Sequence, residues 1–370
     1  MDRCRFGDVV REIKNSIDRE NNPYDYYIAG GHMDSEDLHI HRRGSFKNDD
    51  VGPAFIREFK KGQVLYGSRR TYLKKVAVAD FDGVTANTTF VLETKDEKAL
   101  LQSLLPFVML SDSFTEWSIG KSKGSTNPYV LFSDLADYEF ELPPIEKQRT
   151  LAKLLWEIDR TKCSYKDLID KTDELVKSQF IEMFGDFKTN PKGINITTID
   201  QLFDVGSSKR VFQKEWKSEG VPFYRAREII KLAEQGFVDN ELFISEEMYR
   251  QYAEKYGVPQ PGDIMVTGVG TLGACYLVRD GDRFYYKDGN TLCFHSLGRV
   301  DSRFVVECFK MPFIREQIED NAVGSTVGTY TIEKAKRTRI FNPPKNEQER
   351  FVSIVNQSDK SKFYRFRSIS

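Results

Sequence analysis

The chain has 370 residues, with 55 Lys and Arg against 56 Asp and Glu, a formal net charge of −1 and 39% hydrophobic residues. This is the composition of a globular protein, and the length predicts two or three domains. The balanced charge argues against a uniformly basic nucleic-acid coat protein and against an acidic tail protein, but it leaves room for local basic patches.

Residues 1–141 predict a strand-rich first domain. Short apolar runs at 63–66, 76–79 and 88–92 are broken by turn residues and have the length of strands. After the first run, four cations and one aromatic residue fall within seven positions. Lys and Arg can contact phosphates and Arg can read guanine, although a solvated basic loop is the alternative. The candidate DNA-binding residues are Arg69, Arg70, Tyr72, Lys74 and Lys75.

Residues 142–187 predict a long helix. Pro143-Pro144 suits a helix entrance, and Gly185 suits a C-terminal cap. Between them, positions spaced alternately by four and three form a heptad seam, with charged residues on the other faces. The seam residues are Leu151, Leu155, Ile158, Lys162, Tyr165, Ile169, Thr172 and Val176. We expect the partner of this seam to be a second helix of the same chain.

Residues 188–341 predict a second strand-rich domain, with apolar runs at 222–225, 263–267 and 274–278. Basic and polar residues again follow turn residues. The candidate DNA-binding residues here are Lys209, Arg210, Arg225, Arg227, Thr267 and Thr271. A helix restarts after Pro343-Pro344 and spans 342–370, with Phe351 and Val355 on its seam. Since Ser370 corresponds to Asp170, we expect this second helix to be shorter than the first by about 15 residues.

The chain repeats itself at an offset of 200 residues. The offset aligns Gly124-Ser125-Thr126 with Gly324-Ser325-Thr326, Gln148 with Gln348, and Asp159 with Asp359. A constant offset held over about 100 residues predicts a tandem duplication. The expected fold class is therefore α+β: two duplicated, mixed, strand-rich domains, 1–141 and 188–341, joined by long helices that form an antiparallel coiled-coil spacer.

Two motifs could indicate other chemistry. Gly268-Val269-Gly270-Thr271-Leu272-Gly273 matches the GxGxxG fingerprint of dinucleotide-binding enzymes. A strand follows it where a helix is required, so a tight hairpin is the preferred interpretation. His39 and His41 would share one face of a strand, but no Cys or carboxylate accompanies them at metal-ligand spacing. We therefore predict no metal site, and without HExxH or GxSxG motifs we predict no catalytic residue.

The cysteines and the apolar runs bear on location. Five cysteines are widely spaced without a CxxC pair, which favours a reducing compartment over a disulfide framework. The N-terminal residues lack a signal-peptide pattern, and no apolar run reaches the roughly 18 residues needed to span a bilayer. The sequence predicts a cytoplasmic protein that does not bind a membrane.

Several motifs together carry a resemblance to a known family. They are Leu142-Pro143-Pro144-Ile145-Glu146-Lys147-Gln148-Arg149 at the helix entrance, Phe180-Ile181-Glu182-Met183-Phe184-Gly185 at its close, Pro261-Gly262-Asp263-Ile264 with Gly270 and Gly273, and Tyr66-Gly67-Ser68-Arg69-Arg70 with Ala86-Asn87-Thr88-Thr89-Phe90. With these motifs the chain resembles the specificity subunits of type I restriction-modification systems over essentially its whole length.

The resemblance implies a non-catalytic subunit. Two target-recognition domains would each read one half of a bipartite double-stranded DNA sequence, and the helices would fix the spacer between the halves. Two methyltransferase subunits that use S-adenosylmethionine, and restriction subunits that use ATP and Mg²⁺, would be the partners, with no cofactor in this chain. A nucleotide-dependent enzyme using Gly268–Gly273 and a coiled-coil adaptor without DNA binding are the alternatives.

Overall fold

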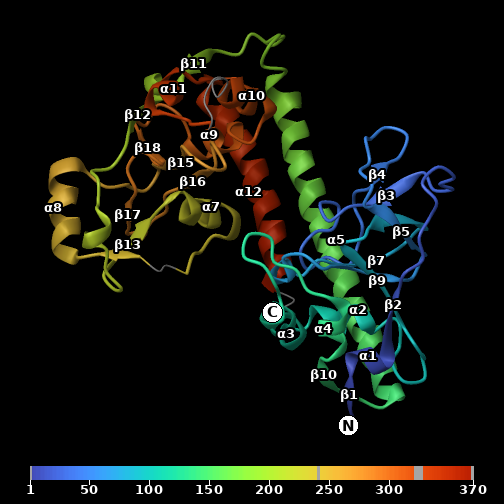
Figure 1. Ribbon diagram of the computed structural model, residues 1–370. Coiled ribbons are helices and arrows are strands. Elements are labelled where there is room, and N and C mark those ends of the chain that lie inside the picture. The colour runs from blue at the N-terminus through green and yellow to red at the C-terminus, as the bar shows by residue number, and fades with distance from the viewer. Residues whose placement is uncertain (1, 240–241, 321–327, 368–370) are drawn as a thin grey trace. The chain divides into compact units, whose positions relative to one another are not determined.

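The structure is a computed structural model that describes residues 2–239, 242–320 and 328–367 (Figure 1). It divides into two compact units, Met1–Tyr165 and Lys166–Ser370. Each is described by itself below. The repeated tripeptide Gly324-Ser325-Thr326 lies outside the described residues.

The first unit contains two four-stranded sheets. Its elements are β1 (Asp2–Arg5), α1 (Phe6–Val9), β2 (Val10–Ile13), β3 (Tyr26–Ile28), β4 (Gly44–Ser45), β5 (Phe55–Phe59), β6 (Val64–Gly67), η1 (Thr71–Leu73), β7 (Val76–Val78), β8 (Gly83–Ala86), β9 (Thr89–Thr94), α2 (Leu105–Leu110), α3 (Asp112–Gly120), α4 (Phe132–Ala136), β10 (Glu139–Leu142) and the start of α5 (Ile145–Phe184). One sheet has the order β2-β9-β6-β7 and is antiparallel, and the other has the order β4-β3-β8-β5 with β3 and β8 parallel.

The core of the first unit explains why its central strands read as continuous apolar runs. Val64, Leu65 and Tyr66 of β6 are all buried, because both faces of this strand are covered. Tyr66 and its neighbours pack against Phe6 and Phe114, which come from α1 and α3. β1 pairs with β10, so the first strand of the unit lies beside the last one before the long helix.

The second unit repeats this plan. Its elements are the rest of α5, β11 (Ile196–Thr198), α6 (Ile199–Leu202), β12 (Phe203–Gly206), η2 (Gln213–Glu215), β13 (Val221–Tyr224), α7 (Ala226–Gln235), β14 (Phe243–Ile244), α8 (Glu246–Tyr256), β15 (Ile264–Thr267), β16 (Cys275–Leu277), β17 (Tyr285–Tyr286), β18 (Thr291–Ser296), α9 (Ser302–Cys308), α10 (Pro312–Asp320), α11 (Ile332–Arg337), β19 (Arg339–Phe341) and α12 (Lys345–Arg367). The main sheet has the order β12-β18-β15-β16, a smaller sheet has the order β14-β13-β17 with β13 and β17 parallel, and β11 pairs with β19.

The two main sheets therefore have the same strand order, and the duplication predicted from the sequence is present in the fold. β6 begins at Val64 and β15 at Ile264, and α5 begins at Ile145 and α12 at Lys345. The α+β class with two related domains is confirmed by this topology.

The long helix α5 has 40 residues and runs from the first unit into the second. In the first unit Ala152 and Leu155 pack on the domain core, whereas Leu151 and Ile158 are exposed. Lys162 donates a hydrogen bond to the Glu36 backbone oxygen at 3.0 Å, so this seam position faces the first domain and not a partner helix. The prediction that one continuous seam packs against a second helix is therefore wrong for this half of α5.

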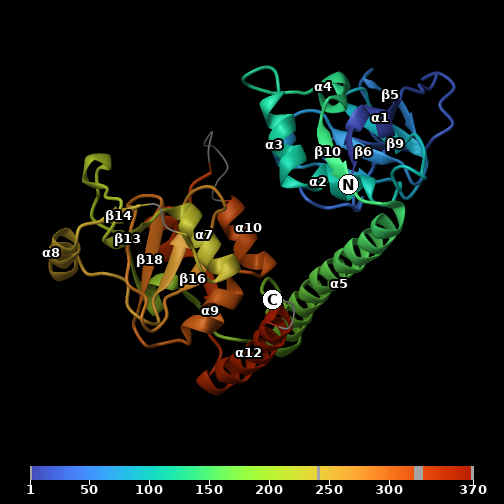
Figure 2. The ribbon, with the colours of Figure 1, turned by 90° about the horizontal axis from the view of Figure 1, so that it is seen from below.

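The second half of α5 does pack on α12. Val176, Phe180 and Phe184 share a core with Phe351 and Val355, and the two helices run in opposite directions (Figures 1 and 2). Tyr165 and Ile169 are half-buried. Gly185 ends the helix with φ +84°, as its position predicted. Val176, Phe351 and Val355 therefore lie in one core shared by the two antiparallel helices.

Two further findings concern the helices and the cysteines. Within the three described segments, no helix combines the length and apolar character that crossing a membrane requires. None of the five cysteines, all of which lie in described segments, forms a disulfide.

Candidate nucleic-acid interface

The basic cluster of the first unit lies on the connection between β6 and β7. Arg70 and Lys74 flank the short helix η1 and adopt left-handed backbone conformations, with φ of +51° and +47°. Such conformations are uncommon for residues with a side chain and turn the chain sharply. The cluster is therefore a tight, ordered loop.

The five predicted residues of this loop divide into two groups. Arg69, Arg70 and Tyr72 are exposed, and Tyr72 has 53% of its surface accessible. Lys74 is paired with Asp112 at 2.8 Å and with Glu36 at 3.2 Å, and the hydrogen bond that its ammonium donates to Asp112 raises the pKa of Lys74. The Lys75 ammonium donates to the Gly30 backbone oxygen. Lys74 and Lys75 thus hold the loop in place, while the first three side chains face solvent.

A second loop lies beside this cluster. The Arg70 backbone N–H donates to the Pro128 oxygen at 2.7 Å, and the Arg70 Nε donates to the Asn127 side chain at 3.2 Å. Asn127 was not identified by sequence reasoning. Its signal was present, because it directly follows the repeated tripeptide Gly124-Ser125-Thr126, which we used only as evidence of duplication.

In the second unit, Lys209 and Arg210 are exposed after β12. The Lys209 ammonium lies 5.8 Å from the centre of the Tyr256 ring, a cation–π contact, and its backbone N–H donates to the Tyr285 hydroxyl at 2.9 Å. Arg210 pairs with Asp288 at 2.8 Å, although 65% of its side chain remains accessible. These two cations are oriented by their neighbours and remain open to a ligand.

Arg225 and Arg227 are placed differently, since both bind Glu228 in the first turn of α7. Burial raises the pKa of Glu228, but the hydrogen bonds from Arg225 and Arg227 outweigh it, and the pKa is lowered overall. Glu228 is 4% exposed. This ion cluster stabilises the start of α7.

The glycine-rich segment between β15 and β16 is a hairpin. The strands on either side of it are antiparallel, and Gly270 and Gly273 have φ of +71° and +70°. A Cβ at Gly273 would lie 2.5 Å from Ile318 Cδ1, so close packing also requires this glycine. The helix that a dinucleotide fingerprint needs does not follow, and the hairpin prediction is confirmed.

The two threonines of this hairpin have different positions. Thr267 is fully buried, and its hydroxyl donates to the Thr271 backbone oxygen and accepts from the Ala274 N–H at 3.0 Å. It supports the hairpin from within. The Thr271 side chain is exposed.

The candidate loops of the two units lie at the same end of equivalent sheets. Val130 N–H donates to the Ser68 oxygen at 2.9 Å, and Tyr330 N–H donates to the Gly268 oxygen at 3.0 Å. Both hydrogen bonds join positions that correspond at the offset of 200. In each unit they lie where the third strand of the main sheet ends, next to the exposed polar residues. The duplicated fold therefore presents two related surfaces with different side chains.

Comparison with known proteins agrees with this architecture. Residues 5–171 match the family described as the type I restriction modification DNA specificity domain. The match covers less than half of the 370 residues. The resemblance stated from the sequence motifs is thereby confirmed.

Individual relatives extend the comparison. A Haemophilus influenzae protein named as a type I restriction enzyme specificity subunit is 27% identical over 173 residues, which cover 45% of this chain and 42% of that protein. The MjaIX specificity subunit of Methanocaldococcus jannaschii is 27% identical over 322 residues, covering 81% of this chain and 71% of that one. The chain thus spans less than half the length of the first of these relatives.

A solved structure supports the fold across both units. The S subunit of a type I restriction-modification system from M. genitalium superimposes with a TM-score of 0.57, covering 99% of this chain and 91% of its own. The sequence identity is 15%, so this likeness concerns the fold alone.

Proposed function

We propose that the chain is the DNA sequence-specificity subunit of a type I restriction-modification complex. Each recognition domain reads one half of a bipartite target, and α5 with α12 sets the spacer between the halves. The observation that carries the proposal is the repeated surface. Equivalent sheets present exposed polar loops at the same end, with Arg69 and Arg70 in one unit and Lys209 and Arg210 in the other.

The difference between the two surfaces supports two different half-sites. A guanidinium can bind guanine O6 and N7 with two hydrogen bonds, whereas Lys is a point charge better suited to phosphate. The first surface carries two Arg and the exposed Tyr72, and the second carries one Lys and one Arg. Recognition of two different half-site sequences requires that the two related surfaces carry different side chains.

The partners in this proposal are two methyltransferase subunits and the restriction subunits. They supply S-adenosylmethionine-dependent and ATP- and Mg²⁺-dependent chemistry, and this chain supplies none. The net charge of −1 fits such an assembly, because partner subunits can provide part of the electrostatic attraction to DNA. The alternative of an adaptor without DNA contact makes the opposite prediction in the experiment that follows.

The test is co-expression with the methyltransferase subunit, followed by mapping of methylated adenines. We expect a split motif. The double substitution Arg69→Ala/Arg70→Ala should change or relax the first half of the motif only, and Lys209→Ala/Arg210→Ala the second half only. A base contact should contribute about 1–3 kcal/mol of discrimination, whereas a phosphate contact should weaken all sequences alike.

A matched control removes two cations from the first unit at the other end of the same sheet. Lys61 and Lys98 are exposed there, before β6 and after β9. Lys61→Ala/Lys98→Ala should leave the motif unchanged. A continuous motif, or half-sites that ignore both loop variants while the complex still assembles, would contradict the proposal.

A further inference from the structure

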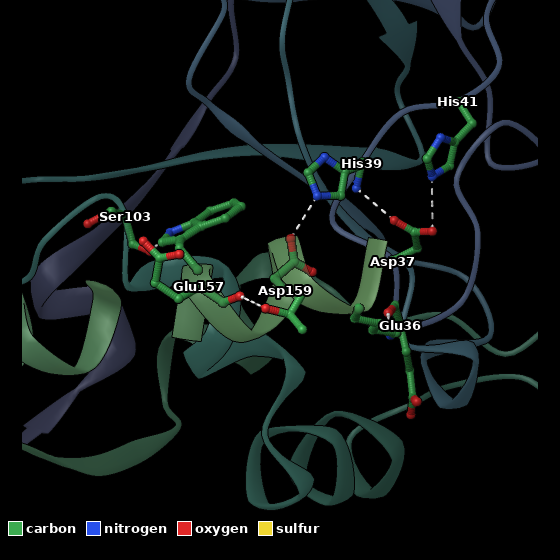
Figure 3. Close-up of polar contacts among 10 residues, drawn as sticks. Glu36, Asp37, His39, His41, Ser103, Glu157 and Asp159 are labelled. Carbon is green, nitrogen blue, oxygen red and sulfur yellow. Dashed lines mark hydrogen bonds and ion pairs between the residues drawn. The ribbon is translucent and has the colours of Figure 1, made fainter. Parts of the chain in front are cut away.

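One cluster of side chains in the first unit has no part in the proposed DNA surface. His39 comes from the segment between β3 and β4, and Asp159 and Cys163 come from α5. The His39 Nε2 lies 2.7 Å from Asp159 Oδ2, and one ligand atom from each of the three residues lies within 4.8 Å of the other two. Figure 3 shows the His39 ring pointing at the Asp159 carboxylate across the face of α5.

The helix and the loop place these groups independently. Asp159 and Cys163 are four residues apart, so they share one face of α5 and lie about one turn apart. The segment that carries His39 is held against this face, because the Lys162 ammonium of α5 donates to the Glu36 backbone oxygen. Within the segment, Asp37 accepts from the His39 N–H at 3.0 Å (Figure 3). The position of His39 beside Asp159 and Cys163 therefore does not depend on the His39–Asp159 contact alone.

The donor set is one nitrogen, one carboxylate oxygen and one sulfur. These are the three kinds of ligand that Zn²⁺ accepts, and ligands of a tetrahedral Zn²⁺ are about 3.4–3.7 Å apart given bonds of 2.0–2.3 Å. The cluster reaches this spacing if the imidazole and carboxylate separate by under about 1 Å and the sulfur approaches. We propose that His39, Asp159 and Cys163 form a binding site for a divalent transition metal of the zinc class, with water completing the coordination.

One neighbouring residue and the burial of Asp159 make the site more favourable. His41 pairs with Asp37 at 3.0 Å, and its ring centre is 6.2 Å from that of His39, so a second imidazole lies near the cluster. The Asp159 side chain is only 12% exposed, whereas the His39 side chain is 40% exposed. A metal ion could enter from the His39 side and bind a partly desolvated carboxylate.

A second cluster offers the same three kinds of donor in a different environment. Asp263, Cys293 and His295 also gather their ligand atoms within 4.8 Å. There, Asp263 already accepts hydrogen bonds from the Gln260 and Ser296 N–H groups at 2.9 Å, besides its pair with His295. Burial raises the pKa of the Cys293 thiol far above its usual value, which disfavours the thiolate that a metal needs. We assign no metal to this cluster.

The site in the first unit would act as a clamp. A metal held by two groups on α5 and one on the loop fastens that loop to the helix, and binding to the folded state alone stabilises it. The repeat does not contain a second copy of this site. Asp359 pairs with Arg303 at 2.5 Å, and Phe363 stands at the position of Cys163. This inference is independent of the proposed function.

The experiment uses the full chain, stripped of metal and titrated with Co²⁺ and then with Zn²⁺. We expect one Co²⁺ per chain, a thiolate-to-cobalt charge-transfer band, displacement by Zn²⁺, and a higher melting temperature with metal. Cys163→Ser should abolish the band, and His39→Gln and Asp159→Asn should each lower the affinity at least about 100-fold, since even second-sphere changes cost 10–100-fold.

The matched control is Cys4→Ser, which alters another half-buried cysteine of the same unit and should leave the band intact. Melting of each metal-free variant shows whether it is folded. The absence of a thiolate band in the folded wild-type chain would overturn the proposal. So would a band of the same intensity in folded Cys163→Ser.

Discussion

The long helices α5 and α12 begin in the same way in the two units, but their equivalent apolar side chains differ in how far they are buried. Leu151 and Phe351 are equivalent positions, yet Leu151 is 43% exposed and Phe351 is fully buried. In the second unit, Phe180 and Phe184 of α5 lie 5.4 and 5.7 Å from the Phe351 ring. The difference shows that duplication preserved how each helix is attached to its domain, while burial of the helix seam depends on which partner segment reaches it.

The shared attachment is a buried glutamine. The Gln148 side chain accepts from the Leu101 N–H at 3.1 Å and donates to the Pro143 oxygen at 2.9 Å. Gln348 accepts from the Asp301 N–H at 2.8 Å and donates to the Pro343 oxygen at 2.8 Å. These two partners correspond at the offset of 200, whereas each glutamine has one further partner of its own, the Ala99 oxygen for Gln148 and the Asn342 side chain for Gln348. The pairing of Gln with the Pro-Pro entrance is therefore a hydrogen-bonded joint present in both copies.

The largest expected difference between the units is in the seam. Phe351→Ala should lower the free energy of unfolding by about 3–5 kcal/mol, because it leaves a cavity among packed aromatic rings. Leu151→Ala should lower it by no more than about 1 kcal/mol, because that side chain is already largely in water. Urea denaturation, with hydrogen exchange resolved to peptides of each unit, measures both effects.

Similar losses for the two seam variants would show that Leu151 is covered in solution, which would remove the contrast between the units. Val355→Ala serves as a control, because Val355 lies in the same core as Phe351 and its loss should also destabilise the second unit.

Substitution of the buried glutamine should destabilise the two units equally. Gln148→Ala leaves the buried Leu101 N–H without its acceptor, and Gln348→Ala does the same to the half-buried Asp301 N–H. The loss of such an acceptor costs about 1–3 kcal/mol. We expect the two losses of unfolding free energy to agree within about 0.5 kcal/mol, each confined to its own unit by peptide-resolved hydrogen exchange. A large loss of unfolding free energy in one unit and none in the other would mean that only one of the two glutamines stabilises its unit.

Much of this fold was accessible from the sequence. The offset of 200 predicted two copies of one unit, and the Pro-Pro entrances and Gly185 placed the long helix within a few residues of its observed bounds. The heptad pattern could not show which seam positions meet a helix and which meet a domain. Lys162 reads as a polar seam residue, but its ammonium binds a backbone oxygen 126 residues away. The spacing of apolar residues predicts which face of a helix is buried, but it does not predict which segment packs against that face.

The candidate sites show the same limit. The density of cations located the loop at 69–75, but composition could not separate the exposed Arg69 from Lys74, which is neutralised by two carboxylates. The spacing of residues in the sequence could not place a carboxylate beside His39, because Asp159 is 120 residues away along the chain. Contacts of that separation become visible only when the domain has folded against α5.

A pair of polar residues at equivalent places in the two main sheets gives a finer comparison. In the first unit Gln63 donates to Glu93 at 2.9 Å, and Arg11 binds the same carboxylate. In the second unit the corresponding pair is Asp263 with His295 at 2.8 Å. The hydrogen bond that Asp263 accepts from the imidazole raises the pKa of His295, which burial alone would lower, and nearby Asp204 raises it further. Burial raises the pKa of Glu93, but Gln63 and Arg11 outweigh it and lower the pKa overall.

These opposite shifts predict opposite pH dependence, and this is the smallest of the expected effects. His295 has a raised pKa in the folded state, so its stabilising contribution is complete below its unfolded pKa of about 6.5 and is lost as the pH rises through the folded value. Glu93 has a lowered pKa, so its contribution is complete above about pH 4.3 and is lost only as the pH falls through the folded value. Between pH 6 and pH 8, the unfolding free energy of the wild type relative to His295→Gln should therefore fall by on the order of 1 kcal/mol or less, since the imidazole is partly exposed. Glu93→Gln, the matched substitution in the first unit, should show a difference that is constant over this range. A constant difference for His295→Gln would mean that its pair with Asp263 does not depend on the charge of the imidazole.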